Sequence, residues 1–107
     1  MIKRDEMKIP QPGLNPAAGV LEETLEHYGI TQARASAAMK INPSYLNEVL
    51  KNKKGMSAEL ALRFQRCFGV PADYLIRLQA SHDFKKAYHA KSAVIGDEVE
   101  ILVSPAA

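Results

Sequence analysis

The side chains most able to do chemistry in this sequence are one cysteine, three histidines and a run of lysines. Cys67 is the single cysteine of the 107 residues, so neither an internal disulfide nor a site of several thiolates is available. His82 and His89 are seven residues apart, whereas a helix-borne metal pair is normally about three or four apart. His27 has no nucleophile near it. We therefore expect no metal, no cofactor and no catalytic site, and we predict that the protein is not an enzyme.

The lysines indicate a different chemistry, the binding of a polyanion. Over residues 51–66 five basic residues (Lys51, Lys53, Lys54, Arg63 and Arg66) stand against Glu59 alone, a sum of +4, although the net charge of the whole chain is only +2. A concentrated basic segment is typical of an edge that contacts phosphates, although ordinary solvated surface can look the same.

Five helices are expected to position these side chains. Asn15-Pro16 and Asn42-Pro43 mark helix starts, because the asparagine can cap the helix and the proline follows where no N–H is needed. Apolar spacing and stop residues predict helices over residues 16–28, 32–39, 43–50 and 58–68, and a fifth from Val70-Pro71 to about Ala90. Cys67 is expected on the buried stripe of the fourth helix. Leu75, Leu78, Phe84 and Tyr88 are expected on the buried side of the fifth.

The two ends of the chain are expected to lie outside this helical domain. Residues 1–14 contain Pro10, Pro12 and Gly13 without periodicity, so they predict an extended arm, and the domain then occupies residues 15–91. Residues 92–107 form a short tail in which Val94-Ile95, Val99, Ile101 and Val103 favour a short strand.

The location expected for the protein is the cytoplasm. Residues 1–6 have no signal-type apolar core, and the apolar stretches are far shorter than the roughly 20 residues that a bilayer needs.

The second and third predicted helices have the proportions of a helix-turn-helix, with an ordinary helical bundle as the alternative. On the third helix Leu46, Val49 and Leu50 form one narrow apolar stripe. The opposite face is wholly polar and would be free to enter a groove. It consists of Ser44, Asn47, Glu48 and Lys51.

A series of short motifs runs through residues 15–84 without a gap. They are Ile30-Thr31-Gln32, Ala37-Ala38-Met39, Ile41-Asn42-Pro43-Ser44, Leu46-Asn47-Glu48-Val49-Leu50, Lys53-Lys54-Gly55-Met56-Ser57-Ala58-Glu59, Ala61-Leu62-Arg63, Phe68-Gly69, Leu78-Gln79-Ala80 and Asp83-Phe84. Together they resemble the HigA-type antitoxins, within the phage-repressor-like (XRE) class of helix-turn-helix proteins. The resemblance implies an all-α, five-helix, lambda-repressor-like domain that binds double-stranded operator DNA as a homodimer.

Several positions depart from the pattern of that family. Lys40 and Asn52 stand where the family commonly has glycine, so a left-handed backbone is expected at both, with less strain for Asn52. Leu75, Arg77 and His82 replace an expected Trp, Asn and aromatic residue. These changes leave the expected fold intact.

The resemblance also implies which residues contact DNA. Gln32 would bind a phosphate of the DNA backbone and also its partner within the helix-turn-helix. The phosphate contact positions the protein on the DNA rather than specifying a sequence. Tyr45 could instead pack on a neighbouring helix, and Glu48 could be a local charge partner of Lys51. The full set expected at the DNA is Gln32, Asn42, Pro43, Ser44, Tyr45, Asn47, Glu48, Lys51, Lys53 and Lys54.

The function that the resemblance implies is an antitoxin that neutralises a RelE-like ribonuclease toxin of the HigB type and represses its own operon. Leu75 and Leu78, with the terminal strand pattern, are the expected dimer interface. Two other functions remain open: a free-standing XRE repressor without a toxin partner, and a helical protein-interaction module whose basic segment is incidental.

The toxin contact is expected to be acidic, because an RNA-cleaving toxin must present a basic surface to its substrate. Two segments qualify, each with a charge of −3. The first helix is favoured because it is folded before a partner arrives. Its acidic residues are Glu22, Glu23 and Glu26, expected on the side away from the basic turn, and those of the tail are Asp97, Glu98 and Glu100.

Overall fold

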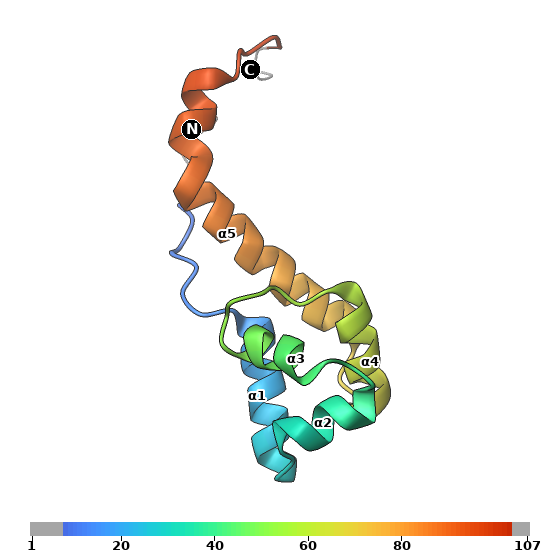
Figure 1. The fold of residues 1–107 in the computed structure, drawn as a ribbon. Helices are drawn as coiled ribbons and strands as arrows, with labels where there is room; N and C mark the ends of the chain where they lie inside the picture. The colour runs from blue at the N-terminus through green and yellow to red at the C-terminus, as the bar shows by residue number, and fades with distance from the viewer. Residues whose placement is uncertain (1–7, 104–107) are drawn as a thin grey trace.

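The computed structural model describes residues 8–103, which form an all-α fold. Its helices are α1 (Pro16–Tyr28), α2 (Gln32–Met39), α3 (Pro43–Leu50), α4 (Ala58–Phe68) and α5 (Ala72–Glu98) (Figure 1). The fold class is therefore confirmed, as are the bounds of the first four helices. None of the helices in residues 8–103 combines the length and the apolar character that a membrane span requires.

The first four helices begin where the sequence places a capping side chain. In each case a side-chain oxygen accepts a hydrogen bond from a backbone N–H of the first turn, which has no partner inside the helix. The caps are Asn15, Thr31, Asn42 and Ser57.

Two of the connections between helices use left-handed backbone at residues other than glycine. Lys40 has φ 58° and Asn52 has φ 61°. Both conformations agree with the left-handed backbone expected at these two positions. Lys40 ends α2 and Asn52 begins the turn after α3.

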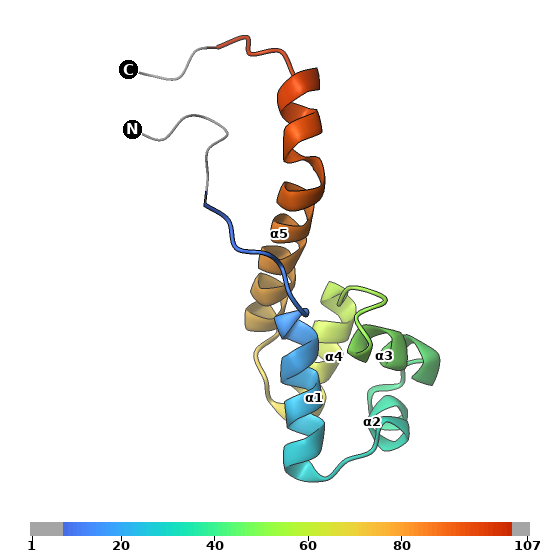
Figure 2. The ribbon, with the colours of Figure 1, turned by 90° about the vertical axis from the view of Figure 1, so that its left-hand side faces the viewer.

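The core lies where α1, α4 and the first half of α5 meet, with α2 and α3 packed against one side (Figures 1 and 2). Leu21, Leu46, Phe64 and Leu75 are fully buried there. They come from α1, α3, α4 and α5, so α3 is held rigidly against the rest of the domain.

The second half of α5 projects away from this core and gives the molecule dimensions of 54 × 23 × 21 Å (Figures 1 and 2). Phe84 is 49% exposed, whereas Leu78 and Tyr88 are half-buried, so the buried side expected for this helix is wrong at Phe84. The reason is that the buried side of α5 runs through Leu75, Gln79 and His82, whereas Phe84 is nine residues after Leu75 and so lies on the opposite side of the helix.

The short strand expected in the tail is also wrong. α5 continues through Val94 and Ile95 to Glu98, so the expected helix end near Ala90 and the domain boundary at residue 91 both fall inside one helix. A lone strand would leave its backbone N–H and C=O groups unpaired, whereas a longer helix pairs them internally. Residues 99–103 contain no strand, and residues 104–107 of the tail lie outside the described residues.

Cys67 is exposed, contrary to the expectation that it lies on the buried stripe of α4. The buried residues of α4 are Leu60, Ala61 and Phe64, in its first two turns. In the last turn Phe68 packs against the core instead, and the centroid of its ring is 4.6 Å from the centroid of the Phe64 ring.

The described part of the N-terminal arm, residues 8–14, has no helix or strand and lies beside α5 (Figure 2). The His89 ring joins the two, because its Nε2 is 2.8 Å from the Ile9 carbonyl oxygen and 2.9 Å from that of Pro10. The arm thus leads away from α2 and α3. Residues 1–7 of the expected arm lie outside the described residues.

Candidate nucleic-acid interface

α2 and α3 pack directly against each other across a three-residue connection, residues 40–42. α2 contributes the small buried residues Ala35 and Ser36, which allow a close approach. α3 buries Leu46 and Val49, the stripe expected from the sequence. This arrangement orients the opposite side of α3 toward solvent.

The outward side of α3 is polar, and one of its residues is bonded to the start of α2. Ser44 is exposed and Asn47 is half-buried. The Asn47 side-chain amide donates a hydrogen bond to Gln32 Oε1 at 3.2 Å. The expected bond between Gln32 and its helix partner is therefore present, and it holds Asn47 in a defined orientation.

The basic turn folds back on the end of α3. The backbone N–H groups of Lys53 and Lys54 donate to the Glu48 carbonyl oxygen at 2.8 and 3.3 Å. The Lys54 ammonium also lies 3.1 Å from the Glu48 carboxylate. Glu48 is therefore a local charge partner, but of Lys54 rather than Lys51. Lys51 and Lys53 are exposed and make no ion pair within residues 8–103.

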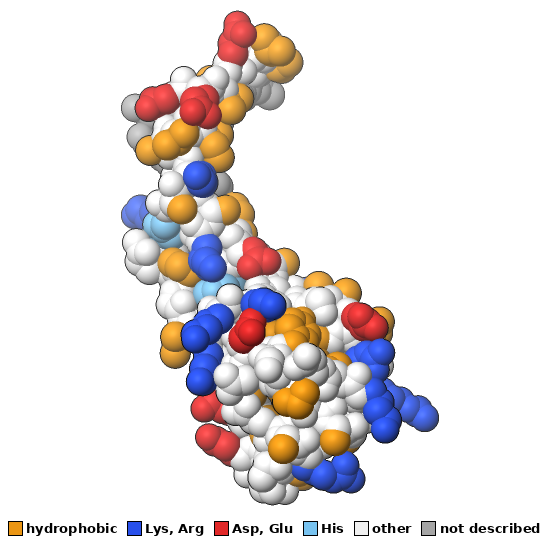
Figure 3. Space-filling view, viewed as in Figure 1, with side chains coloured by type: hydrophobic (Ala, Val, Ile, Leu, Met, Phe, Trp, Pro, Cys, Tyr) orange, Lys and Arg blue, Asp and Glu red, His pale blue; other side chains and the backbone are white. Residues whose placement is uncertain are grey.

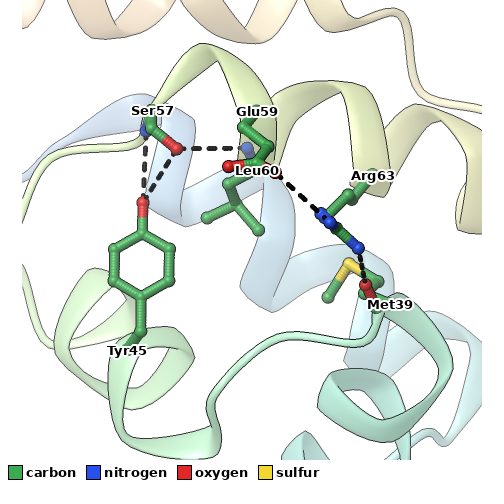
Figure 4. Close-up of polar contacts among 6 residues, drawn as sticks. All are labelled: Met39, Tyr45, Ser57, Glu59, Leu60 and Arg63. Carbon is green, nitrogen blue, oxygen red and sulfur yellow. Dashed lines mark hydrogen bonds and ion pairs between the residues drawn. The ribbon is translucent and has the colours of Figure 1, made fainter.

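Tyr45 joins α3 to the start of α4 (Figure 4). Its ring is half-buried, and its hydroxyl donates to Ser57 Oγ at 3.1 Å and accepts from the Ser57 backbone N–H at 3.3 Å. Ser57 Oγ in turn caps α4 through the Leu60 N–H at 3.1 Å. These contacts favour the structural alternative for Tyr45, packing on a neighbouring helix, over a base contact.

Arg63 stabilises the end of α2, a role that the sequence did not suggest (Figure 4). One guanidinium nitrogen donates to the Met39 carbonyl oxygen at 2.8 Å, and another lies 3.2 Å from the Glu59 carboxylate. The Met39 carbonyl belongs to the last turn of α2, where carbonyl groups lack partners within the helix. Arg63 therefore contributes both to the positive charge of the surface and to the geometry of the turn before α3.

A buried amide network anchors the other end of the basic turn. Gln79 Oε1, on α5, accepts from the Asn15 side-chain amide and from the Met56 backbone N–H, both at 2.7 Å. Gln79 Nε2 donates to the Asp83 carboxylate at 2.9 Å. One side chain of α5 therefore ties the start of α1 to the end of the turn.

The three glutamates of α1 line two different hollows. Glu22 and Glu26 line a hollow of about 450 Å³ together with Gln32 and Lys51. Glu23 lines a separate hollow with His27 and Tyr28. Glu22 and Glu26 therefore border Gln32 and Lys51, which are expected to bind phosphates, whereas Glu23 does not line that hollow.

Charge is distributed so that the polar side of α3 is flanked by cations. Figure 3 shows Lys and Arg side chains on both sides of α3, with carboxylates at the lower left of the same face and a few others next to the cations. Within residues 8–103 no three His, Cys, Asp or Glu side chains come together as a possible metal site. The surface around α3 is thus suited to a polyanion.

A helix-turn-helix family, HTH_3, matches residues 21–75 of the chain, which is more than half of its length. The chain belongs to this family. The match begins in α1 and ends in the first turn of α5, so it contains the helix-turn-helix formed by α2 and α3.

Proteins similar to this helix-turn-helix chain include a curated relative and several solved structures. Virulence-associated protein I of Dichelobacter nodosus is 30% identical over 87 residues, 81% of each chain. The antitoxin GraA superimposes with a TM-score of 0.78 at 25% identity, over 87% of this chain and 99% of its own. The Pseudomonas aeruginosa antitoxin HigA, described with the higBA promoter, has a TM-score of 0.72 at 26% identity, over 90% of this chain and 100% of its own. The resemblance to HigA-type antitoxins is therefore confirmed.

Proposed function

We propose that this protein is an antitoxin that binds operator DNA through α3, as a homodimer in the cytoplasm, and represses its own operon. The observation that carries the proposal is the oriented polar side of α3, flanked by Lys51 and Lys53, which make no ion pair within residues 8–103. The similarity to antitoxins, one of them described with its promoter, supports it.

The proposed complex places α3 in the major groove, where an asparagine amide can pair with an adenine. Asn47 is held toward the groove by Gln32, so it is the residue most able to read a base. Ser44 and the start of α3, at Asn42 and Pro43, lie beside it. Gln32, Lys51, Lys53 and Lys54 would contact phosphates, which set affinity rather than sequence preference.

Two substitutions separate these roles. Asn47→Ala should weaken binding to the operator by about 1–3 kcal/mol and leave binding to unrelated duplexes unchanged, because only base contacts depend on sequence. Lys53→Ala should weaken binding to every duplex alike and reduce the slope of log affinity against log salt by about 1. Fluorescence anisotropy titrations at several salt concentrations measure both effects. If neither variant changed the titrations, α3 and the basic turn would not be the DNA interface.

Of the dimer interface expected at Leu75, Leu78 and the terminal pattern from Val94 to Val103, we keep the terminal part and not Leu75. Leu75 is fully buried in the core of its own protomer, so it has no surface to offer a partner, and Leu78 is half-buried. The projecting half of α5 instead exposes large apolar side chains, including Phe84 at 49%, Val94 at 47% and Ile95 at 52%. We therefore place the interface there, since exposed apolar surface of this kind favours association.

The toxin partner that we propose is a RelE-like ribonuclease of the HigB type, and the names of the similar antitoxins support it. Glu22, Glu23 and Glu26 remain the proposed contact. Glu22 and Glu26 share a hollow with Gln32 and Lys51, so a toxin bound at this edge would lie next to the DNA. Glu23 is the residue that can test toxin binding without disturbing the phosphate contacts.

Charge reversal at Glu23 should weaken rescue of cells that express the adjacent toxin, while operator affinity stays within about twofold, because an exposed surface substitution has little effect on the fold. Reversal of all three glutamates should abolish rescue.

The comparison variant carries Asp97→Asn, Glu98→Gln and Glu100→Gln. Rescue that survives the triple reversal but is lost in this comparison variant would move the contact to the end of α5. Operator binding with no toxin to neutralise would indicate a free-standing repressor.

A further inference from the structure

A small polar hollow lies between the basic turn and α5, outside the helix-turn-helix itself. It has a volume of about 60 Å³, enough for more than one water molecule. Its lining combines side chains distant in sequence, among them Asn52, Lys53, Lys54, Gln79, His82 and Lys86.

The charged groups around the hollow favour an anion. Three lysine side chains line it, against the single carboxylate of Asp83, which already accepts a hydrogen bond from Gln79 at 2.9 Å. Glu48 is the other carboxylate nearby, and it contacts Lys54 from the side of α3. Lys53 and Lys86 make no ion pair within residues 8–103, so both ammonium groups are available to a ligand.

Two neutral side chains add donors of the kind that oxygen anions accept. Asn52 uses its side-chain oxygen to accept from the Asn15 backbone N–H at 3.0 Å, which leaves its NH₂ group available. His82 is only 7% exposed, and its Nδ1 has no hydrogen-bond partner within residues 8–103. Buried polar atoms are rarely left unpaired, and the usual explanation is a bound water or ion. In the tautomer with a proton on Nδ1, this nitrogen would donate to an anion.

We propose that this hollow is a phosphate site, and that a phosphate of the DNA backbone fills it in the operator complex. The inference rests on the proposed function, and it extends the DNA interface from the helix-turn-helix to α5. Lys54 connects the two regions, because it contacts Glu48 of α3 and also lines the hollow. Lys86 is the residue through which α5 contacts the phosphate.

The first test measures the affinity of the full chain for operator and scrambled duplexes at several salt concentrations. Lys86→Gln should weaken binding to both duplexes by the same factor and reduce the salt slope by about 1, the amount expected for one phosphate contact. Lys91→Gln is the matched control, because Lys91 is exposed on the same helix outside the hollow. A slope for Lys86→Gln equal to that of the wild type would overturn the proposal.

The second test uses inorganic phosphate without DNA and follows by NMR two groups that line the hollow, the Gly55 amide and the His82 ring nitrogens. Saturable shifts that Lys86→Gln removes would support the site, and shifts that are linear in phosphate and equal in both proteins would overturn it. Saturable shifts combined with an unchanged DNA salt slope would mean that the site takes free phosphate, which contradicts the DNA assignment. If the wild type bound no duplex specifically, the proposed function would fail, and the phosphate titration would still decide whether the hollow binds anions.

Discussion

Replacing Gln79 with methionine should lower the free energy of unfolding by about 3 kcal/mol. Methionine has a similar volume, so the substitution removes hydrogen bonds without creating a large cavity. The Asn15 side-chain amide and the Met56 backbone N–H would both lose their 2.7 Å bonds to Gln79. A buried donor without a partner costs about 1–3 kcal/mol, and two are created here.

Urea unfolding followed by circular dichroism measures this loss. Gln65→Met is the matched control, because Gln65 also accepts a backbone N–H bond, from Ala72 at 2.7 Å, but is itself exposed. Its loss should be near 1 kcal/mol, the net value of a typical hydrogen bond. Equal stability of the wild type and Gln79→Met would show that the buried network does not hold the basic turn.

Introducing a charge at Ile95 should separate the homodimer. Ile95→Asp should raise the dimer dissociation constant at least about 100-fold, because an unpaired charge at a buried interface is strongly unfavourable. Operator affinity should fall with it, since two-fold symmetric half-sites need two copies of α3 at a fixed spacing. The melting temperature of the monomer should not change, because Ile95 is 52% exposed in the protomer.

Sedimentation velocity at micromolar concentration distinguishes the two states. Leu62→Asp is the control, because Leu62 is 61% exposed on α4, away from the projecting half of α5. This variant should remain a dimer. A monomeric wild type with full operator affinity would contradict the dimer, and dissociation by Leu62→Asp but not by Ile95→Asp would move the interface to α4.

The sequence could predict the short helices because their signals are local. A cap such as Asn15 or Asn42 and a left-handed end such as Gly29 act within a few residues of themselves. The polar side of α3 could be predicted for the same reason, since Leu46 and Val49 fix which side is buried. DNA contacts at that side remain a prediction.

The length and packing of α5 could not be predicted, because they depend on residues distant in sequence. Whether Leu75 is buried and Phe84 exposed is decided by which side of the helix packs against α1 and α4. The alternation of Val94 to Val103 resembled a strand, but no second strand exists within residues 8–103 to pair with it.

The polar contacts of α5 left a signal in the sequence that its apolar pattern obscured. Gln79, His82 and Lys86 recur at helical spacing, and they form a polar stripe that faces the basic turn. Two partners of Gln79, Asn15 and Met56, are more than 20 residues away in sequence, so only the fold brings them together. The role of Tyr45 at the start of α4 depended on the fold in the same way.

The central claim, that α3 reads a DNA sequence, is tested most directly by one competition titration of the wild-type chain. The operator is taken as the strongest duplex selected from a random library, and the competitor is a scrambled duplex of the same length and composition. We predict that the operator binds at least about 1,000-fold more tightly at physiological salt, the lower end of the range for specific DNA-binding proteins. Equal affinity for the two duplexes would contradict the account.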